Sequence, residues 1–243
     1  LTHLGSNALY SVKSMKEWSI SATCTYDAYA FSGIASIHKL VLSKDMPLSQ
    51  NLFSNLPNLE IVVFKDDISA YTLPEGLFSG CSKLVAVDYR GAWKNIPATI
   101  FKGCSKLNMK VPTDAISIGN EAFMGCLSMS GKISLAADAT VGESAFANCK
   151  SITELEFCGQ ARSFAKDCFA GLGITSLTYV QPKSCGAEIF KGCASLEKVV
   201  LPNGTTSLGT YMFQDCKALK EVSIPDSMTS INDYVFQNCA ALE

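Results

Sequence analysis

Eleven cysteines are the residues in this chain whose type and spacing could carry chemistry. Seven of them follow a phenylalanine by three residues: Cys81, Cys104, Cys126, Cys149, Cys193, Cys216 and Cys239. In a small secreted scaffold, so many thiols would indicate a disulfide framework. Zinc would instead need C-x-x-C pairs or a histidine close to the thiols, and the sequence offers neither.

The cysteine position is also filled by other apolar residues, because Ile34, Leu56 and Leu172 occupy it elsewhere. Exchange with Ile and Leu indicates a buried thiol that serves as a small apolar filler. If the units stack, the Cα atoms would lie within disulfide range, but parallel side chains disfavour the required torsion. We expect the other cysteines to divide into Cys168 and Cys185 in the core, and Cys24 and Cys158 at the surface.

Residues for acid–base or nucleophilic catalysis are scarce. The chain has two histidines, His3 and His38, and neither has a recognisable orienting partner of the kind that a catalytic base requires. Glu154 and Glu156 stand two residues apart, where a solvated surface pair is the default interpretation. The glycines follow the turns and form no phosphate-binding loop. We therefore predict no enzymatic activity and no catalytic, cofactor or metal site.

The elements that position these residues form an internal repeat. Its anchor is a phenylalanine that recurs every 21 to 25 residues, at Phe31, Phe53, Phe78, Phe101, Phe123, Phe146, Phe169, Phe190, Phe213 and Phe236. An earlier unit begins near Leu4 and continues through Met15, Trp18 and Ile20. We predict about eleven units of about twenty-three residues in a single domain, 1–243, and we expect it to be truncated at both ends.

Each unit ends in a short alternating run such as Leu219, Val222 and Ile224, followed by Pro225. Alternation predicts a half-buried strand, and a proline after it ends the pairing. Turn residues follow, and we expect a compact helical turn around 145–149. So short a unit cannot form a core alone, so the units should stack, with each phenylalanine on the next and the strands in parallel.

Composition excludes two classes of partner. The chain is 48% hydrophobic and 17% charged, as expected of a well-packed protein, and its formal net charge is −2. Binding of nucleic acid requires a basic surface, which this balance does not supply. No run reaches the eighteen apolar residues of a membrane span, so we expect no direct membrane insertion.

The repeat resembles the BspA-like, treponemal-type leucine-rich repeat. One copy reads Ile118, Gly119, Ala122, Phe123, Cys126, and another reads Leu208, Gly209, Met212, Phe213, Cys216, Leu219, Val222, Ile224, Pro225. The resemblance implies an α/β leucine-rich-repeat solenoid (horseshoe), a β-dominated right-handed superhelix with a parallel concave sheet and short convex strands or helical turns. Three units depart from the family pattern. The unit with Leu172 in place of Cys is one residue short, the loop at 66–72 is two residues longer, and Lys110 falls in a shortened strand.

The resemblance also implies an extracellular or cell-surface location and adhesin-like binding of a host or surface protein, of matrix or plasma type, or of a glycan. Binding would use the outward strand face, for which alternation selects Lys39, Val41, Ile61, Val63, Asp88, Lys132, Glu154, Glu156, Lys198 and Val200. Val41, Ile61 and Val63 form its most apolar part, and flanking loops that cover them are an equal alternative. A second possible function is a spacer within a larger surface protein.

Overall fold

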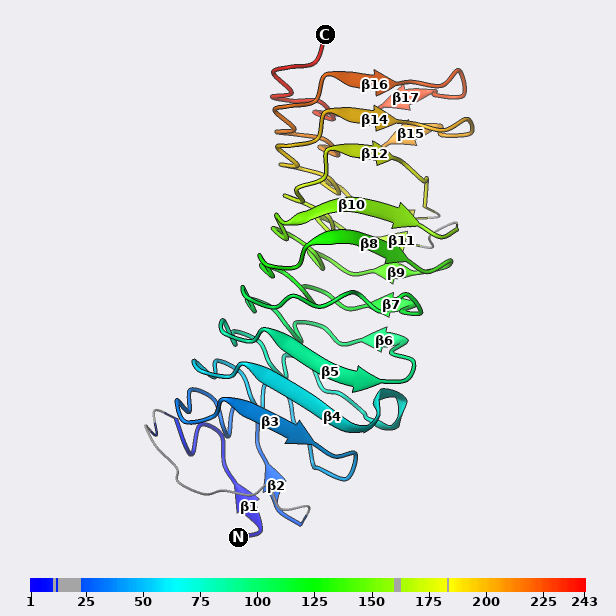
Figure 1. Ribbon diagram of the computed structural model, residues 1–243. Coiled ribbons are helices and arrows are strands. Elements are labelled where there is room, and N and C mark those ends of the chain that lie inside the picture. The colour runs from blue at the N-terminus through cyan, green and yellow to red at the C-terminus, as the bar shows by residue number, and fades with distance from the viewer. Residues whose placement is uncertain (11, 13–22, 160–162, 183) are drawn as a thin grey trace.

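The computed structural model describes residues 1–10, 12, 23–159, 163–182 and 184–243. The chain forms an elongated stack of coils, with the two ends of the chain at opposite ends of the stack (Figure 1). The predicted repeat positions Met15, Trp18 and Ile20 lie outside the described residues. No helix in the described part is long and apolar enough to cross a membrane.

One side of the stack, here called the long-strand face, carries the predicted alternating strands. They are β3 (Lys39–Leu42), β4 (Ile61–Asp67), β5 (Ala86–Arg90), β8 (Gly131–Leu135), β10 (Ile152–Phe157), β12 (Ser176–Thr178), β14 (Lys198–Val200) and β16 (Glu221–Ser223). All pair in parallel, in the groups β3-β4-β5, β8-β10 and β12-β14-β16. No strand forms around Lys110, so β5 and β8 belong to separate sheets.

A second side of the stack carries strands of two residues each. They are β1 (His3–Leu4), β2 (Thr25–Tyr26), β6 (Asn95–Ile96), β7 (Ser117–Ile118), β9 (Thr140–Val141), β11 (Ser163–Phe164), β13 (Ser184–Cys185), β15 (Ser207–Leu208) and β17 (Ser230–Ile231). Five of them form a parallel sheet in the order β13-β11-β9-β7-β6. In the middle of this sheet one residue of each strand points inward, and Ile96, Ile118 and Val141 are buried in this way.

The ten phenylalanines form one continuous column in the core, as the sequence predicts. Neighbouring rings are stacked, with centroids between 5.3 and 6.3 Å apart. This distance exceeds the roughly 4.8 Å between neighbouring strands and lies in the favourable range for offset aromatic pairs. The buried aliphatic residues join the same core cluster.

The expected helical turn is not found, and an open turn returns the chain instead. Within the described residues the one helix is a single 3-10 turn, η1 (Ile68–Ala70). The reason lies two residues before and two residues after each phenylalanine, where φ is positive, as at Thr99 (52°) and Gly103 (73°) around Phe101. A left-handed residue cannot continue a right-handed helix, so the α/β expectation is replaced by a nearly all-β solenoid.

These left-handed residues let the turns hydrogen-bond to one another along the stack. Between two coils the bonds run from the N–H groups of Thr99, Phe101 and Gly103 to the carbonyls of Asn120, Ala122 and Met124, at 2.8, 2.9 and 2.7 Å. The same three bonds recur at the next coil, from Glu121, Phe123 and Gly125. Backbone groups that a helix would satisfy internally are therefore satisfied between coils.

The repeated cysteines pack behind the turns, and six of the seven are fully buried, with Cys239 partly exposed. Each thiol lies against a phenylalanine carbonyl of the preceding coil, as Cys104 does against Phe78 and Cys193 against Phe169, at 3.2 and 3.4 Å. Burial raises the pKa of Cys81 and of Cys193 to about 12. The predicted role as buried filler is confirmed, with a weak hydrogen bond added.

Two of the remaining cysteines contradict the prediction. Cys24 is buried, because it directly precedes β2 and points inward, as Ala139 does before β9. Cys185 is exposed, although it stands in a core position of the repeat. Tyr179, only 1% exposed, fills the core beside it, with its hydroxyl 3.7 Å from the Cys185 sulfur. Cys168 is buried and Cys158 is exposed, as predicted.

Candidate binding surfaces

The ten predicted binding residues all lie on strands of the long-strand face, but they fall into three separate patches. The strand pairing places Lys39, Val41, Ile61, Val63 and Asp88 on β3–β5, then Lys132, Glu154 and Glu156 on β8–β10, then Lys198 and Val200 on β14. Val63 and Val200 are half-buried and the other eight are exposed. The surface is therefore discontinuous, since the sheet is interrupted on both sides of β8–β10.

The patch on β3–β5 is apolar at its centre. Val41 lies opposite Val63, and Ile61 lies between Lys39 and Ala86 on the neighbouring strands. Val41 and Ile61 are each 38% exposed. The described loops therefore leave both side chains exposed. Exposed apolar residues gathered in this way are characteristic of surfaces that bind a partner.

Val85 extends this patch, and the sequence reasoning missed it. It stands directly before β5 and is 47% exposed, with its N–H bonded to the Glu60 carbonyl at 2.9 Å. The corresponding position in other coils is polar, as at Glu60, Asn108 and Lys220. An apolar residue in a polar column was the available signal.

Most charged residues of the second and third patches are paired with an opposite charge on a neighbouring strand. Glu156 Oε2 lies 2.9 Å from Lys132 Nζ and accepts a hydrogen bond from the Ser134 hydroxyl at 2.6 Å. The hydrogen bonds from Ser134 and Lys132 lower the pKa of Glu156, and the bond to Glu156 raises the pKa of Lys132. On β14, Lys198 Nζ lies 2.8 Å from Glu221 on β16. Paired surface charges of this kind give little affinity for another molecule.

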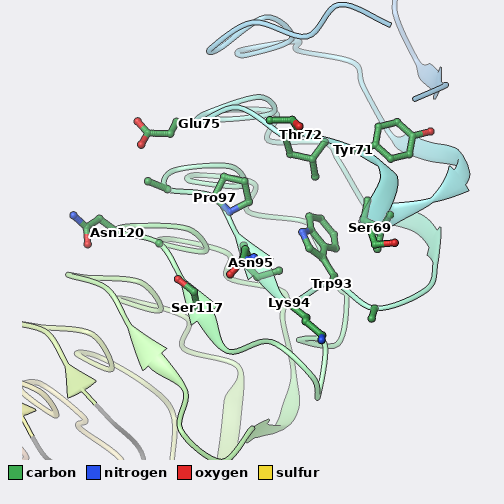
Figure 2. Close-up of a pocket in the computed structure, with 16 residues that line it drawn as sticks. Ser69, Tyr71, Thr72, Glu75, Trp93, Lys94, Asn95, Pro97, Ser117 and Asn120 are labelled. Atoms are coloured by element: carbon green, nitrogen blue, oxygen red, sulfur yellow. The ribbon is translucent and has the colours of Figure 1, made fainter. Parts of the chain in front are cut away.

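A groove on the short-strand side is the second candidate surface (Figure 2). It has a volume of about 1010 Å³, and its lining includes Tyr71, Thr72, Trp93, Asn95 and Pro97. The groove lies where the chain between Phe53 and Phe78 is longer than the other units. The additional residues extend β4, form η1, and leave residues 72–73 without a short strand beside β6.

The walls of the groove are held by an aromatic cluster. Phe64 contacts Tyr71 and Trp93 edge to face, at centroid distances of 5.0 and 6.1 Å. The Tyr71 hydroxyl donates a hydrogen bond to the Leu42 carbonyl at 2.9 Å, and burial raises the pKa of this hydroxyl. Asp67 accepts bonds from the Ser69 N–H and hydroxyl at 2.9 and 2.6 Å, which lower the pKa of Asp67.

The comparisons with known proteins agree with this geometry. The family model of the BspA type leucine rich repeat region matches in six copies, over residues 2–130 and 117–243. The chain belongs to the BspA-type leucine-rich repeat family. The sequence resemblance to that family is therefore confirmed, and no protein matched in a comparison with curated sequences.

Three solved structures with leucine-rich or related folds are similar to this BspA-type chain. A leucine-rich repeat protein of T. pallidum is 23% identical, covers 85% of this chain and 84% of its own, and has a TM-score of 0.51. A leucine-rich repeat protein from Bacteroides ovatus is 19% identical, and the match covers 100% of this chain and 69% of that protein, with a TM-score of 0.61. The pneumococcal vaccine antigen PcpA is 20% identical, and the match covers 95% of this chain and 55% of that protein, with a TM-score of 0.59. These likenesses establish the fold alone.

The BspA-type stack described here brings no three His, Cys, Asp or Glu side chains together as a metal site in its described part. His3 lies 3.5 Å from Asp27 and His38 lies 3.9 Å from Glu60, and all four side chains are exposed. His3 Nδ1 also lies 3.0 Å from the Thr25 hydroxyl, so each exposed histidine contacts polar groups at the surface.

Proposed function

We propose that this chain is an adhesin-like binding protein of the cell surface or extracellular space, which recognises a host or surface protein through the patch on β3–β5. The observation that carries the proposal is the adjacency of Val41, Ile61 and Val63 on two paired strands, with Val41 and Ile61 exposed. Membership of the BspA-type leucine-rich repeat family and the similarity in fold to the pneumococcal vaccine antigen PcpA support the surface location.

The patch favours a protein of matrix or plasma type over a glycan. Its centre is aliphatic and flat, and burial of such side chains drives protein association. Lys39 and Asp88 at its margin supply charges of both signs, which can fix the orientation of a partner without steering one class of charged ligand. Binding would be additive contact across three strands, with no chemical step.

A binding screen against purified matrix and plasma proteins, with a glycan array alongside, tests the proposal. The double variant Val41→Glu/Ile61→Glu introduces two charges at the centre of the patch and should weaken binding at least tenfold. The matched control is Ser176→Glu/Thr178→Glu, which adds the same charges at exposed positions of β12. Thermal unfolding of both variants establishes that the fold is retained.

Four results would contradict the proposal. Equal loss in both double variants would indicate a general charge effect. Unchanged affinity in the patch variant would move the contact elsewhere. Absence of any protein ligand would favour a spacer in a larger surface protein, and a hit confined to the glycan array would replace the protein partner with a sugar.

A further inference from the structure

We propose that the groove beside β6 binds an extended peptide segment of another protein, which adds to the free edge of β6 as a further strand. This site lies on the short-strand side and is independent of the patch on β3–β5. The backbone groups at the edge, the shape of the groove and the side chains around it all favour such a ligand.

The hydrogen-bonding pattern of the short strands identifies the free groups. In the two coils after β6, alternate N–H groups of the short strands donate to the preceding coil. Ser117 and Gly119 donate to Lys94 and Ile96 at 3.1 and 2.9 Å, and Thr140 and Gly142 donate to Ile116 and Ile118 at 2.9 and 2.8 Å. The equivalent positions in the coil of β6 are Asn95 and Pro97. Proline has no N–H, so this edge offers the Asn95 N–H as its donor.

No described strand pairs with β6 on this side, because β6 is the last strand of its sheet. The Asn95 N–H and carbonyl therefore form one donor–acceptor pair at the edge, which is the unit of recognition in β-strand addition. Pro97 prevents the pairing from extending further along the edge, as prolines commonly do at sheet edges. A peptide would consequently be bound in one register, opposite Asn95.

The groove is open but bounded. At one end Asp67 of β4 pairs with Arg90 of β5, and at the other the Gly76 N–H bonds to the Ala98 carbonyl at 3.0 Å. Between these points the two coils are apart, and the volume of about 1010 Å³ is at the upper end of ordinary ligand sites. The anchored aromatic walls preorganise the opening, which reduces the cost of binding.

The side chains favour a peptide over a sugar. Trp93 is only 4% exposed and the Tyr71 ring packs against Phe64, so neither presents an open aromatic face to a sugar ring. Lys94 and Glu75 lie at opposite ends of the groove (Figure 2). A peptide with an acidic residue near Lys94 and a basic residue near Glu75 would complement both charges.

Selection of random eight-residue peptides displayed on phage against the whole chain tests the proposal. Enriched sequences are synthesised and titrated by fluorescence anisotropy, and each backbone amide is then N-methylated in turn. Strand addition predicts at least tenfold weaker binding at the one or two alternate amides that face β6, with little effect at their neighbours. Because only the peptide is altered, the folding of the protein is not involved.

Variants of the chain localise the binding. Asn95→Pro removes the edge donor, and Thr72→Trp fills the groove from an exposed position; each should weaken peptide binding at least tenfold. The control Val41→Glu/Ile61→Glu should leave it unchanged, so failure of this site and failure of the patch on β3–β5 are distinguishable. Circular dichroism identifies any variant that does not fold, and Thr72→Trp then decides.

Several outcomes would overturn the proposal: no enriched peptide, tolerance of N-methylation at every amide, or binding that Thr72→Trp leaves intact. A glycan-array ligand that Thr72→Trp displaces, in the absence of a peptide ligand, would assign the groove to a sugar instead.

Discussion

Two regions of the stack differ in how strictly they repeat. In the regular region, residues 186–236, successive phenylalanines are 23 residues apart, and Phe190 and Phe213 stack at 5.6 Å. In the interrupted region, residues 61–98, the coil is two residues longer and Phe53 and Phe78 are 6.3 Å apart. The regular region has a paired short strand in each coil, whereas the interrupted region has a groove.

The interruption affects one side of the stack and leaves the turn side unchanged. Cys81, which ends the longer coil, lies 3.2 Å from the Phe53 carbonyl, close to the 3.3 Å between Cys216 and Phe190 in the regular region. The two additional residues are therefore accommodated between the end of β4 and the next turn, and the turns stay in register. The groove, which the regular coils lack, is therefore found at the unit whose length differs from that of the others.

The largest expected effect is on Trp93, which fills the interrupted region. Ala115 occupies the equivalent position before β7 and is 1% exposed. Trp93→Ala introduces the residue found in the coil of β7, but in this coil it leaves a cavity. We therefore expect the free energy of unfolding to fall by about 3–5 kcal/mol. Urea denaturation measures the change, with Trp93→Phe as a milder control. A loss below about 1 kcal/mol would mean that the groove region has no tightly packed core.

Thiol reactivity compares the turn sides of the two regions. Because burial raises the pKa of Cys81 and Cys193 from 9.0 to about 12, the thiolate fraction of each is about a thousandfold lower, equivalent to about 4 kcal/mol. Both should resist iodoacetamide equally, while the exposed Cys158 reacts at an ordinary rate. Mass spectrometry after timed labelling gives the rates. Labelling of Cys81 more than tenfold faster than Cys193 would show that the longer coil loosens the turns as well.

The smallest effect concerns acid stability in the regular region. The hydrogen bond from Lys191, at 2.7 Å, lowers the pKa of Glu188 below its ordinary 4.5. A lowered pKa stabilises the fold above pH 4.5, and this contribution disappears as the pH falls through the folded-state value. Glu188→Gln should reduce the free energy of unfolding by about 0.5 kcal/mol at pH 7.

The control measurement is the same comparison at a pH below the lowered pKa of Glu188, where the wild type and Glu188→Gln should become equal, since both side chains are then neutral. A difference that persists at that pH would indicate that the substitution disturbs packing rather than charge.

The sequence predicted the columns of the core because residues that recur at nearly equal intervals lie above one another when the coils stack. Ten phenylalanines at nearly equal intervals require a single column, and the interchange of Cys with Ile and Leu identified buried thiols. The path of the turns was not predicted. Gly103, Gly125 and Asn148 after the phenylalanines were available signals of positive φ, but Glu121 and Tyr211 before them adopt the same conformation without any residue signal.

The candidate surfaces were predicted only in part. Alternation correctly selected Val41 and Ile61 as exposed, since their neighbours Leu40 and Val62 are buried. The sequence indicated a shortened strand at Lys110, but not that the long-strand face is divided there, because strand formation depends on pairing with both neighbours. The groove was also missed: the longer loop of 66–72 was visible in the sequence, but its consequence depends on how Trp93 and Tyr71 fill the space behind it.

The inter-coil bonds of the turns have an electrostatic consequence. All of them run the same way, from the N–H groups of one coil to the carbonyls of the following coil, as from Phe190 to Met212 and from Phe213 to Val235. Aligned peptide dipoles add, as they do along a helix. From the turn of Phe31 to that of Phe236, the turn edge of the stack is therefore electrically polar, with its positive pole toward Asn238, although the net charge of the chain is close to zero.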